Sequence, residues 1–184
     1  MNKLIKILTK EQWKEIGYIA LKTLIFVILF SILHFLYSLN ENPFFRAIAG
    51  KDESVFQHLK MGFFSYLLLI IFDYLLVRKK IENRESFLYS RLLSSLLVPW
   101  MIFIIWYLAP AIIGLPLSLP WELTWAFFVV IVVGILASLF DKNIEKISFN
   151  KSVKIIIIGL IIISIFLFIL FSFNNPWIDV FVEP

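Results

Sequence analysis

Five long apolar blocks constrain this chain more than any other feature of its sequence. Each block holds about twenty residues, the length that an α-helix needs to cross roughly 30 Å of hydrocarbon at about 1.5 Å per residue. A soluble domain of 184 residues would carry more charge, because 61% of this chain is hydrophobic and only 16% is charged. The sequence therefore predicts an all-α, polytopic transmembrane helix bundle that forms a single domain over residues 1–184. Its five spans are expected at about residues 18–39, 55–77, 92–113, 121–140 and 153–173.

Basic residues separate these blocks unevenly, and their distribution predicts the orientation of the bundle. They gather before the first span, between the second and third, and between the fourth and fifth. The positive-inside rule then places the N-terminus in the cytoplasm and the C-terminus outside, with the plasma membrane as the expected location. Residues 1–17 mix lysines with apolar side chains, so we expect an amphipathic segment that lies in the membrane interface before the first span.

Composition and motifs exclude several function classes. The net charge of +4 does not indicate nucleic-acid binding, because the basic residues occupy the positions between spans. The expected partner is the lipid bilayer, and other membrane subunits remain an open alternative. Cysteine is absent, which excludes thiolate catalysis and cysteine-ligated metals. Phosphate-binding loops, dinucleotide fingerprints and metalloprotease motifs do not occur in the sequence, and it leaves the identity of any cofactor undetermined.

Two ionisable residues lie about one turn inside the cytoplasmic ends of the first two spans. These are Lys22 and Asp73. Charged groups inside a membrane span are costly, so they generally pair or serve a function. Equal depth and opposite sign predict a structural ion pair between them. In the alternative interpretation, Lys22 extends to the interface and Asp73 faces the arginines of the adjacent loop.

A second group of polar residues lies toward the outer ends of the same two spans. His34 shares one face of the first helix with two serines, and His58 lies near the start of the second helix, shortly after Glu53. Two histidines with a carboxylate can bind zinc or carry out proton transfer. We therefore expect a polar pocket here, against the alternative of a purely structural cluster. The candidate pocket residues are His34, Tyr37, Glu53, His58 and Glu122, the candidate metal ligands are His34, Glu53 and His58, and Asp179 and Glu183 can approach from the tail.

These histidines belong to a recognisable pattern. The run Leu33-His34-Phe35-Leu36-Tyr37, followed by Glu53-Ser54-Val55 and by His58-Leu59-Lys60, resembles the motif of an uncharacterised family of small bacterial and archaeal multi-pass membrane proteins. The resemblance is specific over about residues 33–64 and covers the remainder in layout. Asp52, Phe56 and Gln57 depart from the family pattern, and the tail lacks the histidine that the family carries there. The resemblance implies that His34, Glu53 and His58 are motif members, but it supplies no known activity.

Three function classes remain open after these steps. The first is a membrane protein that binds a small ligand, or takes part in transport, through the outer polar pocket. The second is an intramembrane enzyme that uses the outer histidine and glutamate residues. The third is a structural or regulatory subunit of a larger membrane complex, for which His34 and His58 would be dispensable.

Overall fold

Helices joined by short connections make up the described part of the chain, with no strand in residues 9–114 and 118–182 of this computed structural model. Five helices are long and apolar enough to cross a membrane, which confirms the prediction of an all-α bundle with five spans. They are α2 (Lys10–Leu39), α4 (Val55–Val77), α5 (Arg84–Ile113), α6 (Leu119–Ile144) and α7 (Lys151–Phe173). Two short elements accompany them, α3 (Pro43–Ile48) and a 3-10 helix, η1 (Asp179–Phe181).

Several helices extend beyond the apolar blocks from which they were predicted. Thr9 caps α2 through a reciprocal pair of hydrogen bonds with Gln12, so this helix begins at Lys10. Residues 10–17, predicted as a separate interfacial segment, are therefore the first turns of α2, and residues 1–8 lie outside the described part. In the same way Asn83 caps the backbone N–H groups of α5, which begins eight residues before the predicted span.

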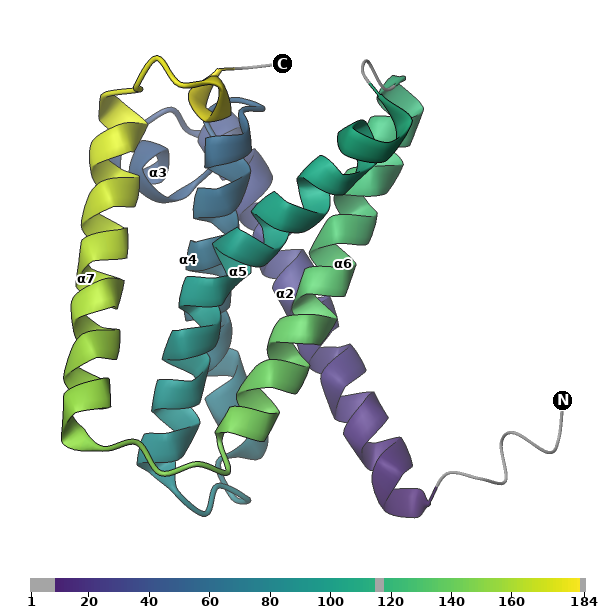
Figure 1. The fold of residues 1–184 in the computed structure, drawn as a ribbon, viewed down its shortest axis with the longest axis vertical. Coiled ribbons are helices and arrows are strands. Elements are labelled where there is room, and N and C mark those ends of the chain that lie inside the picture. The colour runs from purple at the N-terminus through teal and green to yellow at the C-terminus, as the bar shows by residue number, and fades with distance from the viewer. Residues whose placement is uncertain (1–8, 115–117, 183–184) are drawn as a thin grey trace, which may run out of the picture.

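The long helices run up and down the bundle and leave it with two distinct ends (Figure 1). We call the end with α3 and η1 the α3 end. The opposite end carries the connections after α4 and α6, with Lys79, Lys80 and Lys146, and we call it the basic end. Helices α5 and α6 run side by side and lean away from α4 and α7 toward the α3 end, while α2 crosses the bundle obliquely.

The main apolar core lies where α2, α4, α5 and α6 meet. It includes the fully buried side chains of Phe26, Tyr66 and Val98, while a smaller cluster around Phe63 packs against α7. Gly62 lets α4 approach α5 closely, because a Cβ atom at this position would lie 2.4 Å from the Cδ1 atom of Ile102. This contact layer separates the polar groups at the two ends of the bundle.

Candidate functional site

The loop before α4 brings Glu53 to two histidines on neighbouring helices. His34 comes from the last turns of α2 and His58 from the first turns of α4, and the Gly50 N–H donates to the Leu33 carbonyl and ties the loop to α2. The Glu53 Oε2 atom lies 3.4 Å from His34 Nε2 and 3.6 Å from His58 Nε2. The two imidazole ring centres are 5.5 Å apart. We call these three residues the His–Glu cluster.

The orientation of His58 is fixed by the backbone. Its Nδ1 atom lies 3.0 Å from the Ser54 carbonyl oxygen, and since a carbonyl only accepts, Nδ1 must carry the proton of this hydrogen bond. In the neutral imidazole, Nε2 then presents a lone pair toward Glu53 and His34. On its other side the ring stacks nearly parallel to Trp106, with centres 6.2 Å apart.

Pro110 explains how the wall beside His58 is held. A proline lacks the N–H that would bond the carbonyl four residues earlier, so the Trp106 carbonyl loses its partner within α5. The indole N–H of Trp125, on α6, donates to that carbonyl at 3.0 Å. The two helices are thus joined at this level by a hydrogen bond that the proline itself makes available.

The His–Glu cluster forms part of the wall of a cavity of about 610 Å³ between α2, α4, α5 and α6. The ionisable lining residues lie toward the α3 end, where Glu122 and Asp179 line the cavity in addition to the cluster. Because α6 begins at that end, Val129 and Val130 of the same wall lie roughly 11 Å deeper. The cavity is therefore amphipathic, with a polar mouth and an apolar interior lined by Phe30, Ile102, Trp106, Trp125, Val129 and Val130.

The other residues expected in the pocket divide into three cases. Glu122 and Asp179 line the cavity, as does Ser31. Tyr37 is not among the lining residues, because it is six residues beyond Ser31 and so projects about 120° away from that side chain around α2. Glu183 lies outside the described residues.

A second polar region lies within the bundle toward the basic end. The Lys22 ammonium lies 2.7 Å from Asp73 Oδ2 and 2.7 Å from Asp141 Oδ2, and all three side chains are buried. Arg91 Nε donates to Asp73 at 3.1 Å, and the same guanidinium pairs with Glu145. We call these five residues the buried charge network; four are buried on four different helices, and Glu145 caps the end of α6 and is 27% exposed.

Tyrosine hydroxyls complete this network. Tyr66 donates to Asp141 at 2.6 Å, and Tyr18 donates to Asp73. Among the described residues, Asp141 Oδ1 is left without a hydrogen-bond partner. The guanidinium of Arg91 also lies over the Phe87 ring, 3.9 Å from its centre.

Sequence reasoning placed three members of this network wrongly or left them out. Arg91 and Asp141 fall just outside the spans predicted at residues 92–113 and 121–140, yet both are buried inside helices that continue past the apolar blocks. Glu145 was not singled out. The available signal was the helix caps, since Asn83 marks a start of α5 well before Arg91.

Lys60, also within the motif, has a different setting from the histidines. Its side chain is fully buried, and the ammonium donates to the Arg46 carbonyl at 2.9 Å and to the Ser172 hydroxyl at 2.8 Å. Arg46 Nε in turn donates to the Ser172 carbonyl. These contacts join α3, α4 and α7 at the α3 end.

Five apolar helices and a polar-mouthed cavity between them define a multi-pass helical membrane protein. The chain belongs to the Family of unknown function (DUF6512), whose model matches residues 3–184, and this confirms the resemblance to an uncharacterised family. Comparisons with functionally curated proteins and with solved structures give no match.

Proposed function

We propose that this protein binds a small amphipathic molecule in the cavity between α2, α4, α5 and α6. The observation that carries the proposal is the convergence of His34, Glu53 and His58 on the wall of a 610 Å³ cavity whose interior is apolar. Binding sites for small molecules are typically cavities of this size, apolar with a few convergent polar groups. The polar group of the ligand would lie at the mouth, against the His–Glu cluster.

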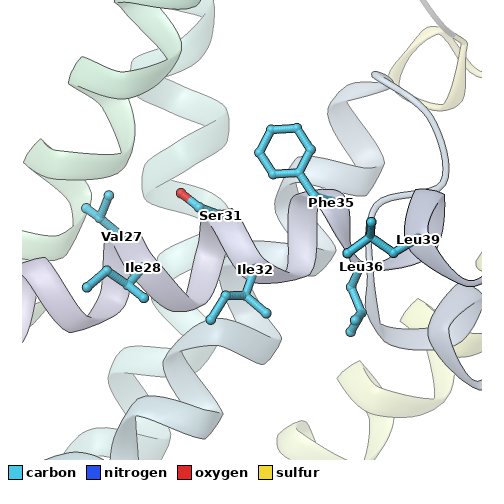
Figure 2. A pocket seen from close by; sticks show the side chains of 7 residues that line it. All are labelled: Val27, Ile28, Ser31, Ile32, Phe35, Leu36 and Leu39. Carbon is cyan, nitrogen blue, oxygen red and sulfur yellow. The ribbon is translucent and has the colours of Figure 1, made fainter.

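The surface of α2 supports entry from the membrane. Val27, Ser31 and Phe35 line the cavity and also belong to a shallow groove along the outside of α2. Figure 2 shows the side chains of that groove, in which the Ser31 hydroxyl is the single oxygen. The edge of the cavity thus continues onto an apolar surface that lipid would cover, so an apolar ligand can reach it without crossing water.

The proposal includes the orientation, with the α3 end outside and the basic end in the cytoplasm of the cell. The excess of lysine and arginine at the basic end supports it. The chain has no cysteine, so single cysteines can be introduced at the exposed positions Glu41 and Lys80. In intact cells, a membrane-impermeant maleimide should label Glu41→Cys and not Lys80→Cys. Labelling of Lys80→Cys and not of Glu41→Cys would show that the orientation is the reverse of the one proposed.

Ligand binding can be tested by filling the cavity. Ala126 lines it, whereas Ala111 is exposed on α5 outside it, so Ala126→Phe and Ala111→Phe add the same group in and out of the site. Protein extracted in mild detergent should carry an added mass in native mass spectrometry, in the wild type and in Ala111→Phe. Ala126→Phe should lack it. An adduct that survives Ala126→Phe, or none on the wild type, would refute the proposal and favour a structural subunit.

An intramembrane enzyme is the second candidate, and one observation favours it. Glu122 and Asp179 line the same cavity as the two imidazoles, so a molecule bound there would meet several groups able to transfer protons. The substitution Glu122→Gln separates the two functions. In an enzyme, loss of turnover should replace a product adduct by a substrate adduct of different mass. In a binding protein, the mass of the adduct should stay the same.

A further inference from the structure

We infer that His34, Glu53 and His58 form a site for a divalent metal ion of the zinc class, with one coordination position open to the cavity. The inference deepens the proposed function. It rests on that function for one point only, namely which molecule binds at the open coordination position. It is carried by the spacing of the three ligand atoms, by the orientation of His58 and by the exposure of Glu53.

The spacing matches what one ion requires. Zinc holds histidine nitrogen and carboxylate oxygen at about 2.0–2.2 Å, which sets neighbouring tetrahedral ligands roughly 3.4 Å apart. Glu53 Oε2 stands 3.4 Å from His34 Nε2 and 3.6 Å from His58 Nε2. All three ligand atoms lie within 4.8 Å of one another, so small side-chain rotations bring them onto a common centre.

The hydrogen bond on the far side of His58 prepares the ring for a metal. Metal-binding imidazoles commonly donate their second N–H to a carbonyl or carboxylate, which fixes the tautomer and the ring plane. Here Nδ1 donates to the Ser54 carbonyl at 3.0 Å, and Nε2 faces the centre of the cluster. Stacking on Trp106 further limits rotation of the ring.

Without a cation, this arrangement places two hydrogen-bond acceptors against each other. Neutral His58 would direct its Nε2 lone pair at a carboxylate oxygen, and neither atom has a proton to share. A metal ion removes this conflict, and so does a proton on the imidazole or on the carboxyl group. The protonated ion pair is therefore the competing explanation, and the experiment must separate it from a metal site.

Three protein ligands leave one of four tetrahedral positions free, as in catalytic rather than structural zinc sites. The cluster is part of the cavity wall, so that position can accept water or the polar group of a ligand. The Glu53 side chain is 58% exposed, and an ion can therefore enter and leave from the α3 end. These features predict an exchangeable ion and not a buried structural one.

Zinc alone is the probe in the first experiment. The full chain, purified with a tag that contains no histidine and treated with a chelator, is titrated with Zn²⁺ and its bound metal measured by mass spectrometry after desalting. Wild type should retain about one equivalent. Glu53→Gln and His34→Ala should each bind at least about tenfold more weakly, as losses of metal ligands or their supports do.

Controls distinguish the metal site from other causes of loss. Glu41→Gln makes the same carboxylate-to-amide change at an exposed position in the same connection, and it should retain zinc. Glu53 is exposed, so Glu53→Gln should fold normally, which size-exclusion elution will verify. If wild type binds no more zinc than Glu53→Gln and His34→Ala, the cluster is a proton-stabilised ion pair and the inference is wrong.

The open position has its own readout. Cobalt(II) loaded in place of zinc reports its coordination through its visible absorption spectrum, which should change when azide is added. A spectrum that azide leaves unaltered would contradict the open position. Failure of this inference is distinguishable from failure of the proposed function, because Ala126→Phe should lose the ligand adduct and keep zinc.

Discussion

At one end of the bundle, Lys22 is held by two carboxylates at 2.7 Å each, and the three side chains are at most 1% exposed. At the other end, Glu53 stands 3.4 and 3.6 Å from two imidazoles and is more than half exposed. Both regions connect helices through charged or polar side chains. The first is closed to solvent, whereas the second is open to it. Close contact and burial suit a permanent structural role, whereas open spacing beside a cavity leaves room for a further component.

Removing a charged partner should also cost more free energy in the closed region than in the open one. A charge inside a membrane has no water to solvate it, so the buried charge network must satisfy its members internally. Removing one partner from a buried pair typically costs about 3–5 kcal/mol, because the other charge is left uncompensated. Exposed ion pairs contribute about 0–1 kcal/mol. Substitutions in the two regions should therefore have effects of clearly different size.

Lys22→Met should give the largest loss of stability. It leaves Asp73 and Asp141 facing each other in the core, and we expect the free energy of unfolding to fall by about 3–5 kcal/mol. Thermal unfolding in detergent, followed by circular dichroism, measures the change. Lys14→Met removes an exposed lysine from the same helix and is the matched control. Equal unfolding temperatures for the two variants would show that the network is not a stabilising one.

Bound zinc should raise the contribution of the His–Glu cluster to stability toward that of the buried charge network. An ion that binds the folded chain at one hundred times its dissociation constant stabilises it by about 2.7 kcal/mol. We expect this increase in wild type and its absence in Glu53→Gln, measured by thermal unfolding with and without zinc. An equal increase in both proteins would place the bound ion away from the His–Glu cluster.

A second substitution should restore part of the stability that Lys22→Met loses, and the gain should depend on which carboxylate is removed. Lys22→Met with Asp141→Leu removes one charge of each sign and leaves Asp73 paired with Arg91. Lys22→Met with Asp73→Leu also takes a partner from Arg91. Coupling energies between contacting residues are about 0.5–3 kcal/mol, so the first double variant should be the more stable of the two in thermal unfolding. The reverse order would show that Asp141, not Asp73, is the main partner of Arg91.

Glu53→Gln should have the smallest effect in the absence of metal. The carboxylate is exposed and its imidazole partners lie 3.4 and 3.6 Å away, so we expect a change below about 1 kcal/mol. Chemical denaturation of chelator-treated protein provides the measurement, with Glu41→Gln beside it. A loss as large as that of Lys22→Met would place the cluster among the structural elements of the fold.

Much of the fold followed from block length, because an apolar block of about twenty residues matches a helix that satisfies its own backbone hydrogen bonds across a bilayer. Position along the predicted spans placed Lys22 and Asp73 at one depth and His34 and His58 at another, and the structure has each of these pairs in proximity. The sequence also placed Glu122 at the cavity, but it did so equally for Tyr37, because rotation of a helix is set by its packing partners.

Arg91 and Asp141 show why the rest could not be predicted. Near the end of a span, a charged residue inside the helix and one in the loop give the same hydropathy. The cap at Asn83 indicates that Arg91 is helical, but only its partners outside α5 show that it is buried and paired. Arg91 meets its partners across α4 and α6, in a register that depends on close approaches such as that at Gly62. No local pattern records that register.

The buried charge network has a consequence for how the chain is made. The two carboxylates that hold Lys22 lie 51 and 119 residues further along the sequence, so the ribosome produces them later. While α2 enters the membrane alone, its lysine must reach toward the surface to stay hydrated. Arrival of α4 supplies Asp73, and α6 supplies Asp141 only near the end of synthesis. Withdrawal of this lysine into the bundle thus marks the progress of assembly, and a chain that stalls before α6 holds two cations, Lys22 and Arg91, against the single carboxylate of Asp73 at the place where Asp141 would join them.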